Sequence, residues 1–113
     1  MNQTKGLRIL ENKAAPNCRR VRIFLAEKGI EIPFEQIDIM AGDHFKKDYV
    51  GKVGTFRVPA LELSNGSFLT ESIAICRFFE NEKKENPLFG KTNLELAVVE
   101  MWQRRMEFEL LWP

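Results

Sequence analysis

A proline directly before a short apolar segment is the feature that most constrains how this chain folds. Val58 and Pro59 precede the segment, which covers residues 60–63. Proline has no N–H group, so we expect it at the entry or the edge of a strand. A cis peptide bond before Pro59 would form a sharp turn, and it would leave the main-chain groups of Val58 unpaired and able to bind an extended peptide.

A second signal lies at Glu71 and Ser72, which open an apolar segment of helical period. The hydroxyl group and the free N–H groups at the start of such a helix can hold an anion. Together with Val58, these residues predict a pocket for a short peptide that carries both an amine and a carboxylate.

The rest of the chain alternates strands and helices. The predicted strands cover residues 7–10, 34–39, 60–63 and 67–69, and the predicted helices cover 18–28, 43–50 and 72–82, with a loop over 51–57. The last two strands flank Asn65 and Gly66, which indicate a hairpin turn. Since strands joined through a helix are parallel and hairpin strands are antiparallel, the pattern predicts an α/β fold with the thioredoxin-like order βαβα-ββα.

Composition indicates a globular domain and excludes several kinds of partner. The 113 residues are 44% hydrophobic and 29% charged, and the net charge of +1 produces no field that would attract nucleic acid or a membrane. No apolar run is long enough to span a bilayer. The two cysteines, Cys18 and Cys76, form no disulfide framework, which favours the cytoplasm, and we expect no metal site.

The C-terminal part predicts one further helix. Thr92 and Glu95 have the spacing of a capping box, and apolar side chains follow at helical spacing up to residue 111. Such a stripe must be buried against another surface. A truncated second domain would provide that surface, and a dimer interface is the alternative.

Taken together, the proline turn, the Glu-Ser helix start, the segment at residues 20–29 and the linker to a further helix resemble a cytosolic glutathione transferase over residues 7–111. The resemblance implies a thioredoxin-like glutathione-binding domain at 1–84, a linker at 85–92, and the first helix of a truncated all-α domain at 93–113. It also implies a cytoplasmic homodimer that conjugates glutathione to hydrophobic electrophiles, and a piece of this length would be weakly active or inactive alone.

The resemblance assigns roles to specific residues. The main chain of Val58, before a cis Pro59, would pair with the cysteinyl part of glutathione. Glu71 and Ser72 would hold the γ-glutamyl end, and a basic residue, Arg57 or Lys52, would meet the glycyl carboxylate.

The sequence departs from the family at the group that contacts the glutathione sulfur. The usual Ser or Cys position is Ala15, with Ala14 before it, and neither side chain can donate a hydrogen bond. Some bacterial and fungal relatives resemble this chain in that respect. The main-chain N–H groups of Asn17 and Cys18, an ordered water, or the helical domain remain as sources of the donor.

Two other functions stay open from the residues alone. A non-catalytic assembly module would tolerate Ala15 but would have no need for Glu71 and Ser72. A glutathione-dependent thiol reductase would require a reactive Cys18, which occupies the second-cysteine place of a Cys-x-x-Cys pattern whose first place is Ala15.

Overall fold

The computed structural model describes residues 6–111, so the ends of the first and last predicted domains, at 1–5 and 112–113, lie outside the described residues. The chain divides between Lys83 and Lys84 into two compact units, which are described separately. Within the described residues, no helix has the length and apolar character needed to cross a membrane.

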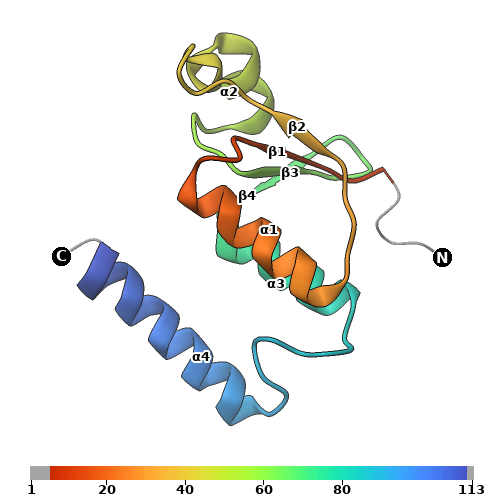
Figure 1. The fold of residues 1–113 in the computed structure, drawn as a ribbon, viewed down its shortest axis with the longest axis vertical. Helices are drawn as coiled ribbons and strands as arrows, with labels where there is room; N and C mark the ends of the chain where they lie inside the picture. The colour runs from red at the N-terminus through yellow and green to blue at the C-terminus, as the bar shows by residue number, and fades with distance from the viewer. Residues whose placement is uncertain (1–5, 112–113) are drawn as a thin grey trace. The chain divides into compact units, whose positions relative to one another are not determined.

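The first unit contains a four-stranded sheet with helices on both sides (Figure 1). Its elements are β1 (Arg8–Glu11), α1 (Pro16–Lys28), β2 (Phe34–Gln36), the 3₁₀ turn η1 (Asp43–Phe45), α2 (Lys47–Val53), β3 (Ala60–Glu62), β4 (Phe68–Thr70) and α3 (Ser72–Glu82). The strand order is β2-β1-β3-β4. β1 and β2 are parallel, whereas β3 is antiparallel to both β1 and β4. The predicted thioredoxin-like fold is therefore confirmed.

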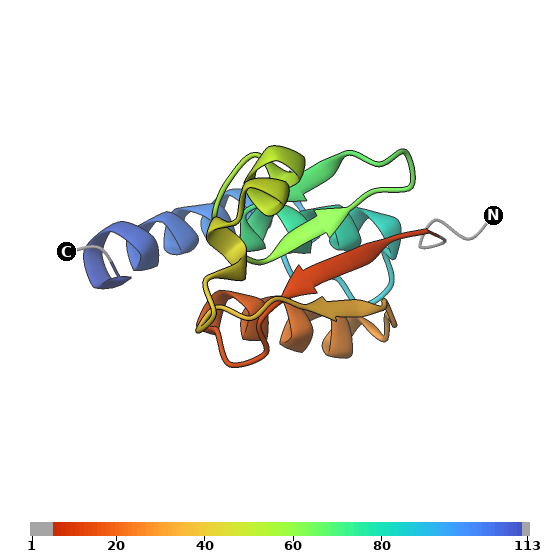
Figure 2. The ribbon, with the colours of Figure 1, turned by 90° about the horizontal axis from the view of Figure 1, so that it is seen from above.

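The sheet separates two layers of helices. α1 and α3 pack side by side against one face, and α2 lies on the other side (Figures 1 and 2). The core consists of side chains that are buried on both faces of the sheet, because successive residues of a strand point in opposite directions. Ile9, Leu61, Ile75 and Phe79 are fully buried, and Leu10, Tyr49, Val53 and Ala60 form a second buried cluster.

β1, β3 and β4 differ from the prediction by one residue at one or both ends, and larger corrections apply to α1, β2 and α2. α1 begins at Pro16 and not at Cys18, because the fixed φ of proline and its missing N–H suit the first position of a helix. β2 ends at Gln36 and not at residue 39, since its partner β1 ends at Glu11. α2 continues to Val53, through residues that were predicted as a loop, because Val53 is buried in the same cluster as Tyr49.

The second unit contains α4 (Asn93–Arg105), which continues into a π-helical turn η2 (Met106–Leu111). The predicted capping box is present at its start. Several large apolar side chains of this helix are exposed, among them Leu94 at 73% and Trp102 at 48%.

Candidate functional site

Strand register brings three chain segments to one edge of the sheet. Leu10, near the end of β1, lies opposite Ala60 at the start of β3. Ala60 in turn lies opposite Thr70 at the end of β4. The loop that leads to α1, the turn at Pro59 and the start of α3 therefore adjoin strand ends at the same edge of the sheet.

The turn before β3 contains a cis peptide bond between Val58 and Pro59. The hydroxyl of Tyr49 donates a 2.6 Å hydrogen bond to the carbonyl oxygen of Arg57, which holds the chain directly before this turn. Burial raises the pKa of Tyr49 to about 12, so the hydroxyl keeps its proton at neutral pH. Among the described residues, no hydrogen bond engages the main-chain groups of Val58, and both remain available to an extended ligand.

Glu71 precedes α3 in an uncommon backbone conformation. Its φ is 73° and its ψ is 120°, and it is one of two described residues other than glycine with a positive φ. A residue with a Cβ is destabilised by about 1–2 kcal/mol in the left-handed region. The side chain is exposed and makes no capping hydrogen bond to the helix, so the carboxylate is not used by α3 itself.

Ser72 is the first residue of α3, and it is 8% exposed. Its hydroxyl accepts a 3.0 Å hydrogen bond from Nη1 of Arg20, which lies on α1. At the other ends of the two helices, the buried Lys28 pairs with Glu80 at 2.8 Å. These two contacts hold α1 and α3 in register, and they place a guanidinium group beside the start of α3.

Sequence reasoning missed Arg20 as a member of the site. The available signal was spacing. Arg20 stands three residues after Asn17 and therefore shares a face with the first turn of the helix.

The start of α1 has no side-chain cap. The N–H of Ala15 donates to the carbonyl of Asn12 at 2.9 Å, and the N–H of Arg19 makes the first intrahelical bond, at 3.0 Å to Ala15. Pro16 has no N–H, so the two free donors of this helix start are the N–H groups of Asn17 and Cys18.

The thiol of Cys18 is a different matter from its N–H group. The side chain is completely buried. Burial is the main cause that raises the pKa of this thiol above its ordinary value. A buried thiol with a raised pKa is a poor nucleophile, which argues against a thiol reductase that depends on Cys18.

The two basic candidates are exposed and carry no ion pair among the described residues. Arg57 directly precedes Val58, and its guanidinium lies 5.7 Å from the centroid of the Phe56 ring. Lys52 lies in the last turn of α2. Within the part of the chain that the structure describes, no group of three His, Cys, Asp or Glu side chains is arranged to hold a metal ion.

Comparison with known proteins identifies relatives of this chain. Residues 14–82 match the family described as "Glutathione S-transferase, N-terminal domain". The chain is 37% identical over 107 residues to "Glutathione S-transferase 2" of Saccharomyces cerevisiae, covering 93% of this chain and 46% of the relative. It is 30% identical over 99 residues to "Glutathione S-transferase F6" of Arabidopsis thaliana, covering 85% and 46%.

Solved structures agree with this result. A glutathione S-transferase domain-containing protein from Marinobacter aquaeolei VT8 has a TM-score of 0.84 and 34% identity, with 88% of this chain and 50% of that chain covered. Gtt2 from Saccharomyces cerevisiae has a TM-score of 0.84 and 37% identity, with 91% and 50% covered. The chain thus spans about half the length of the relatives that it matches.

Proposed function

This chain belongs to the glutathione S-transferase family. We propose that it binds glutathione at the edge of the sheet where Val58 precedes β3 and where Glu71 and Ser72 follow β4. The main chain of Val58 pairs with the cysteinyl residue of the tripeptide, next to Pro59. The exposed carboxylate of Glu71 pairs with the ammonium group, for which its unused side chain is suited.

The α-carboxylate of the γ-glutamyl residue then meets three donors. These are the hydroxyl of Ser72, the N–H groups at the start of α3, and the guanidinium of Arg20. Charge-assisted hydrogen bonds of this kind are stronger than neutral ones, and the helix dipole adds to them. Arg57 or Lys52 pairs with the glycyl carboxylate at the other end of the tripeptide.

The proposed reaction is transfer of the glutathione sulfur to a hydrophobic electrophile. The free thiol of a cysteine has a pKa of about 8.5, so the protein must favour the thiolate at neutral pH. The N–H groups of Asn17 and Cys18 are the donors that we assign to this task, because Ala15 offers none. With an aryl halide, the thiolate forms the new carbon–sulfur bond, the halide leaves, and the thiol proton passes to solvent.

The observation that most supports this proposal is the hydrogen bond between Arg20 and Ser72, which assembles an anion-binding pair at the start of a helix. Titration calorimetry with glutathione provides the test. Ser72→Ala should weaken binding about tenfold, the effect of losing one hydrogen bond to a charged group.

Ser67→Ala is the matched control. It removes a hydroxyl that bonds only to Asn65 in the β3–β4 turn, at the opposite end of the hairpin, and should leave affinity unchanged. Equal affinity of Ser72→Ala and the unmodified chain would refute the assigned site.

A second measurement separates binding from catalysis. The chain is mixed with glutathione and an aryl halide, and the conjugate is measured. Conjugation above the uncatalysed rate supports the transferase activity, whereas glutathione binding without conjugation limits the proposal to binding. Absence of glutathione binding would instead favour an assembly module.

We further propose a homodimer in the cytoplasm, since both are typical of the family. Light scattering coupled to size-exclusion chromatography measures the mass of the particle, and a monomer at micromolar concentration would contradict the dimer.

A further inference from the structure

A buried carboxylate lies at the end of β1, outside the set of residues that the proposed function uses. Glu11 is 1% exposed. Its Oε1 atom lies 3.0 Å from Nε of Arg22 in an ion pair that is not aligned as a hydrogen bond. Its Oε2 atom accepts a 2.6 Å hydrogen bond from Gln36 of β2. A buried charge requires partners of this kind.

The two partners of Glu11 also hold the loop between β1 and α1. Nη2 of Arg22 donates to the carbonyl oxygen of Lys13. The N–H of Lys13 donates to Oε1 of Gln36 at 3.1 Å. The N–H and the carbonyl of Lys13 are therefore both hydrogen-bonded to partners of Glu11. We call Glu11, Arg22 and Gln36 the loop clamp.

The loop clamp acts on a segment that leads directly to Asn17 and Cys18. Asn12 supports the same loop, since its side chain accepts a 3.0 Å hydrogen bond from the N–H of Ala14 and donates one of 3.1 Å to the carbonyl of Ile37. The N–H of Ala15 donates within this loop as well, to the carbonyl of Asn12, and the N–H groups that follow it are the two free donors at the start of α1.

We infer that the loop clamp positions the N–H groups of Asn17 and Cys18 so that they stabilise the glutathione thiolate. This inference rests on the proposed function. A serine hydroxyl can rotate about its side-chain bond to reach a sulfur atom, but a main-chain N–H cannot. Because Ala15 occupies the position of the usual Ser or Cys, the direction of the two donor N–H groups depends only on the path of the loop.

The two charges of the clamp have opposite effects at the start of α1. Burial is the largest cause that raises the pKa of the Cys18 thiol, and among the smaller causes Glu11 raises this pKa and Arg22 lowers it. Both charges therefore act on the thiol of Cys18, in the first turn of α1. Because Arg22 pairs with Glu11, the buried carboxylate is compensated and opposes a thiolate less than it would alone.

The test uses two substitutions that conserve formal charge, so a change cannot arise from the net field. Arg22→Lys keeps the cation but cannot reach Glu11 and Lys13 with one planar fork. Gln36→Ala removes both contacts of an exposed, neutral side chain and should leave the chain folded. The ultraviolet absorbance of the thiolate, followed against pH, reports the thiol pKa of bound glutathione.

We expect each substitution to raise this thiol pKa by about half a unit or more, which lowers the thiolate-to-thiol ratio at least threefold. The glutathione affinity at low pH, where the thiol is protonated, should change much less than this ratio. A nuclear magnetic resonance measurement accompanies the pKa titration. The amide signals of Asn17 and Cys18 should respond differently to glutathione and to S-methylglutathione in the unmodified chain, and the difference should shrink in both variants.

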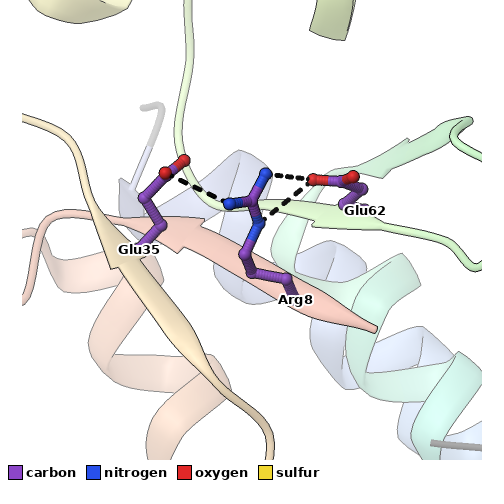
Figure 3. A network of polar contacts seen from close by, with 3 residues as sticks. All are labelled: Arg8, Glu35 and Glu62. Atoms are coloured by element: carbon purple, nitrogen blue, oxygen red, sulfur yellow. Dashed lines mark hydrogen bonds and ion pairs between the residues drawn. The ribbon is translucent and has the colours of Figure 1, made fainter. Parts of the chain in front are cut away.

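Arg8→Lys is the matched control. Arg8 lies at the other end of β1, where it bridges Glu35 of β2 at 3.2 Å and Glu62 of β3 at 3.1 Å (Figure 3). This substitution also conserves charge and also breaks a guanidinium contact to two partners. It should leave the thiol pKa of bound glutathione unchanged.

The outcomes separate the two proposals. If the unmodified chain does not bind glutathione, the proposed function fails. If it binds glutathione, the inference is overturned by any of three results: a bound thiol pKa that is not lowered, no change in Arg22→Lys and Gln36→Ala, or an equal change in Arg8→Lys.

Discussion

The starts of the helices differ in a way that follows their roles. At the start of α4, Thr92 Oγ1 accepts a 3.1 Å hydrogen bond from the N–H of Glu95. The Glu95 carboxylate accepts one of 2.7 Å from Lys91 and one of 3.2 Å from Thr92. Gly90 packs so closely against this turn that a Cβ there would lie 2.7 Å from the Cβ of Glu95. Side chains of this helix start therefore accept hydrogen bonds from the N–H groups of Lys91, Thr92 and Glu95.

α1 and α3 begin without any side-chain cap, at Ala15 and Glu71. A missing cap destabilises a helix by about 0.5–2 kcal/mol. Both helices are instead stabilised by packing, because Val21, Leu25, Ile75 and Phe79 are buried between them and the sheet. α2 also lacks a side-chain cap, at Lys46, so an open start alone does not mark a ligand site. The open starts of α1 and α3 are distinguished by their place, because both adjoin the sheet edge that carries the turn at Pro59.

The largest expected effect concerns Glu71, and it separates the side chain from the backbone. Glu71→Ala and Glu71→Gly both remove the carboxylate, so both should weaken glutathione binding about 10- to 100-fold, as expected for a lost charged partner. Glycine adopts the positive φ of 73° without strain. Glu71→Gly should therefore be more stable than Glu71→Ala by about 1 kcal/mol in urea unfolding.

If the two variants unfold at the same urea concentration, the backbone at this position is not strained. If both bind glutathione like the unmodified chain, the carboxylate does not hold the ammonium group, and α3 lacks the role that its open start indicates.

The next effect comes from closing the start of α1. In Ala15→Asp, the new carboxylate can accept hydrogen bonds from the N–H groups of Asn17 and Cys18. The chain should gain about 1 kcal/mol of unfolding free energy, whereas the thiol pKa of bound glutathione should rise by about one unit, since the donors are occupied and a negative charge lies near.

Ala15→Ser sharpens this prediction, because its hydroxyl can donate to the sulfur as well as cap the helix. It should lower the thiol pKa of bound glutathione. A rise in both variants would mean that a side chain here only obstructs the site, and a change in neither would separate the start of α1 from the sulfur.

The fold could be predicted from the sequence because its signals are local. Asn65 and Gly66 specify the hairpin turn, and the helical period of the segment before Gly29 specifies α1. The boundaries were predicted less well. The start of α1 depends on Pro16, whose preference for the first helical position is also local, whereas the end of β2 depends on where β1 stops pairing.

The candidate site was predictable where a local signal marks it. Val58 and Ser72 follow from a proline and from a helix start, which are features of the chain itself. The contact of Arg20 with Ser72 spans 52 positions, and that of Gln36 with Glu11 spans 25. Such pairs depend on how helices and strands pack. Spacing places Arg20 on the face of the first helical turn, but it does not identify the partner on another element.

A smaller effect is expected when the closed start of α4 is opened. Thr92→Ala removes the capping hydroxyl and should decrease the unfolding free energy by about 0.5–1 kcal/mol, toward the low end for caps because this turn is exposed. Glutathione affinity should stay unchanged in calorimetry. A loss of affinity would show that α4 and the proposed site are coupled, and the contrast between open and closed starts would then not separate structure from function.

The smallest effect is the pH dependence of the same cap. Hydrogen bonds from the main-chain N–H of Lys91, and then of Thr92, lower the pKa of Glu95 below its ordinary value of 4.5. A lowered folded-state pKa means that the contribution of the cap to stability is fully present above pH 4.5 and decreases as the pH falls through the folded-state value. The helical circular dichroism of the unmodified chain should therefore decrease over this range relative to Glu95→Gln, which has an acceptor oxygen but no titration. Parallel pH profiles for the two chains would show that the carboxylate adds nothing beyond a neutral acceptor, and that the start of α4 is closed by Thr92 alone.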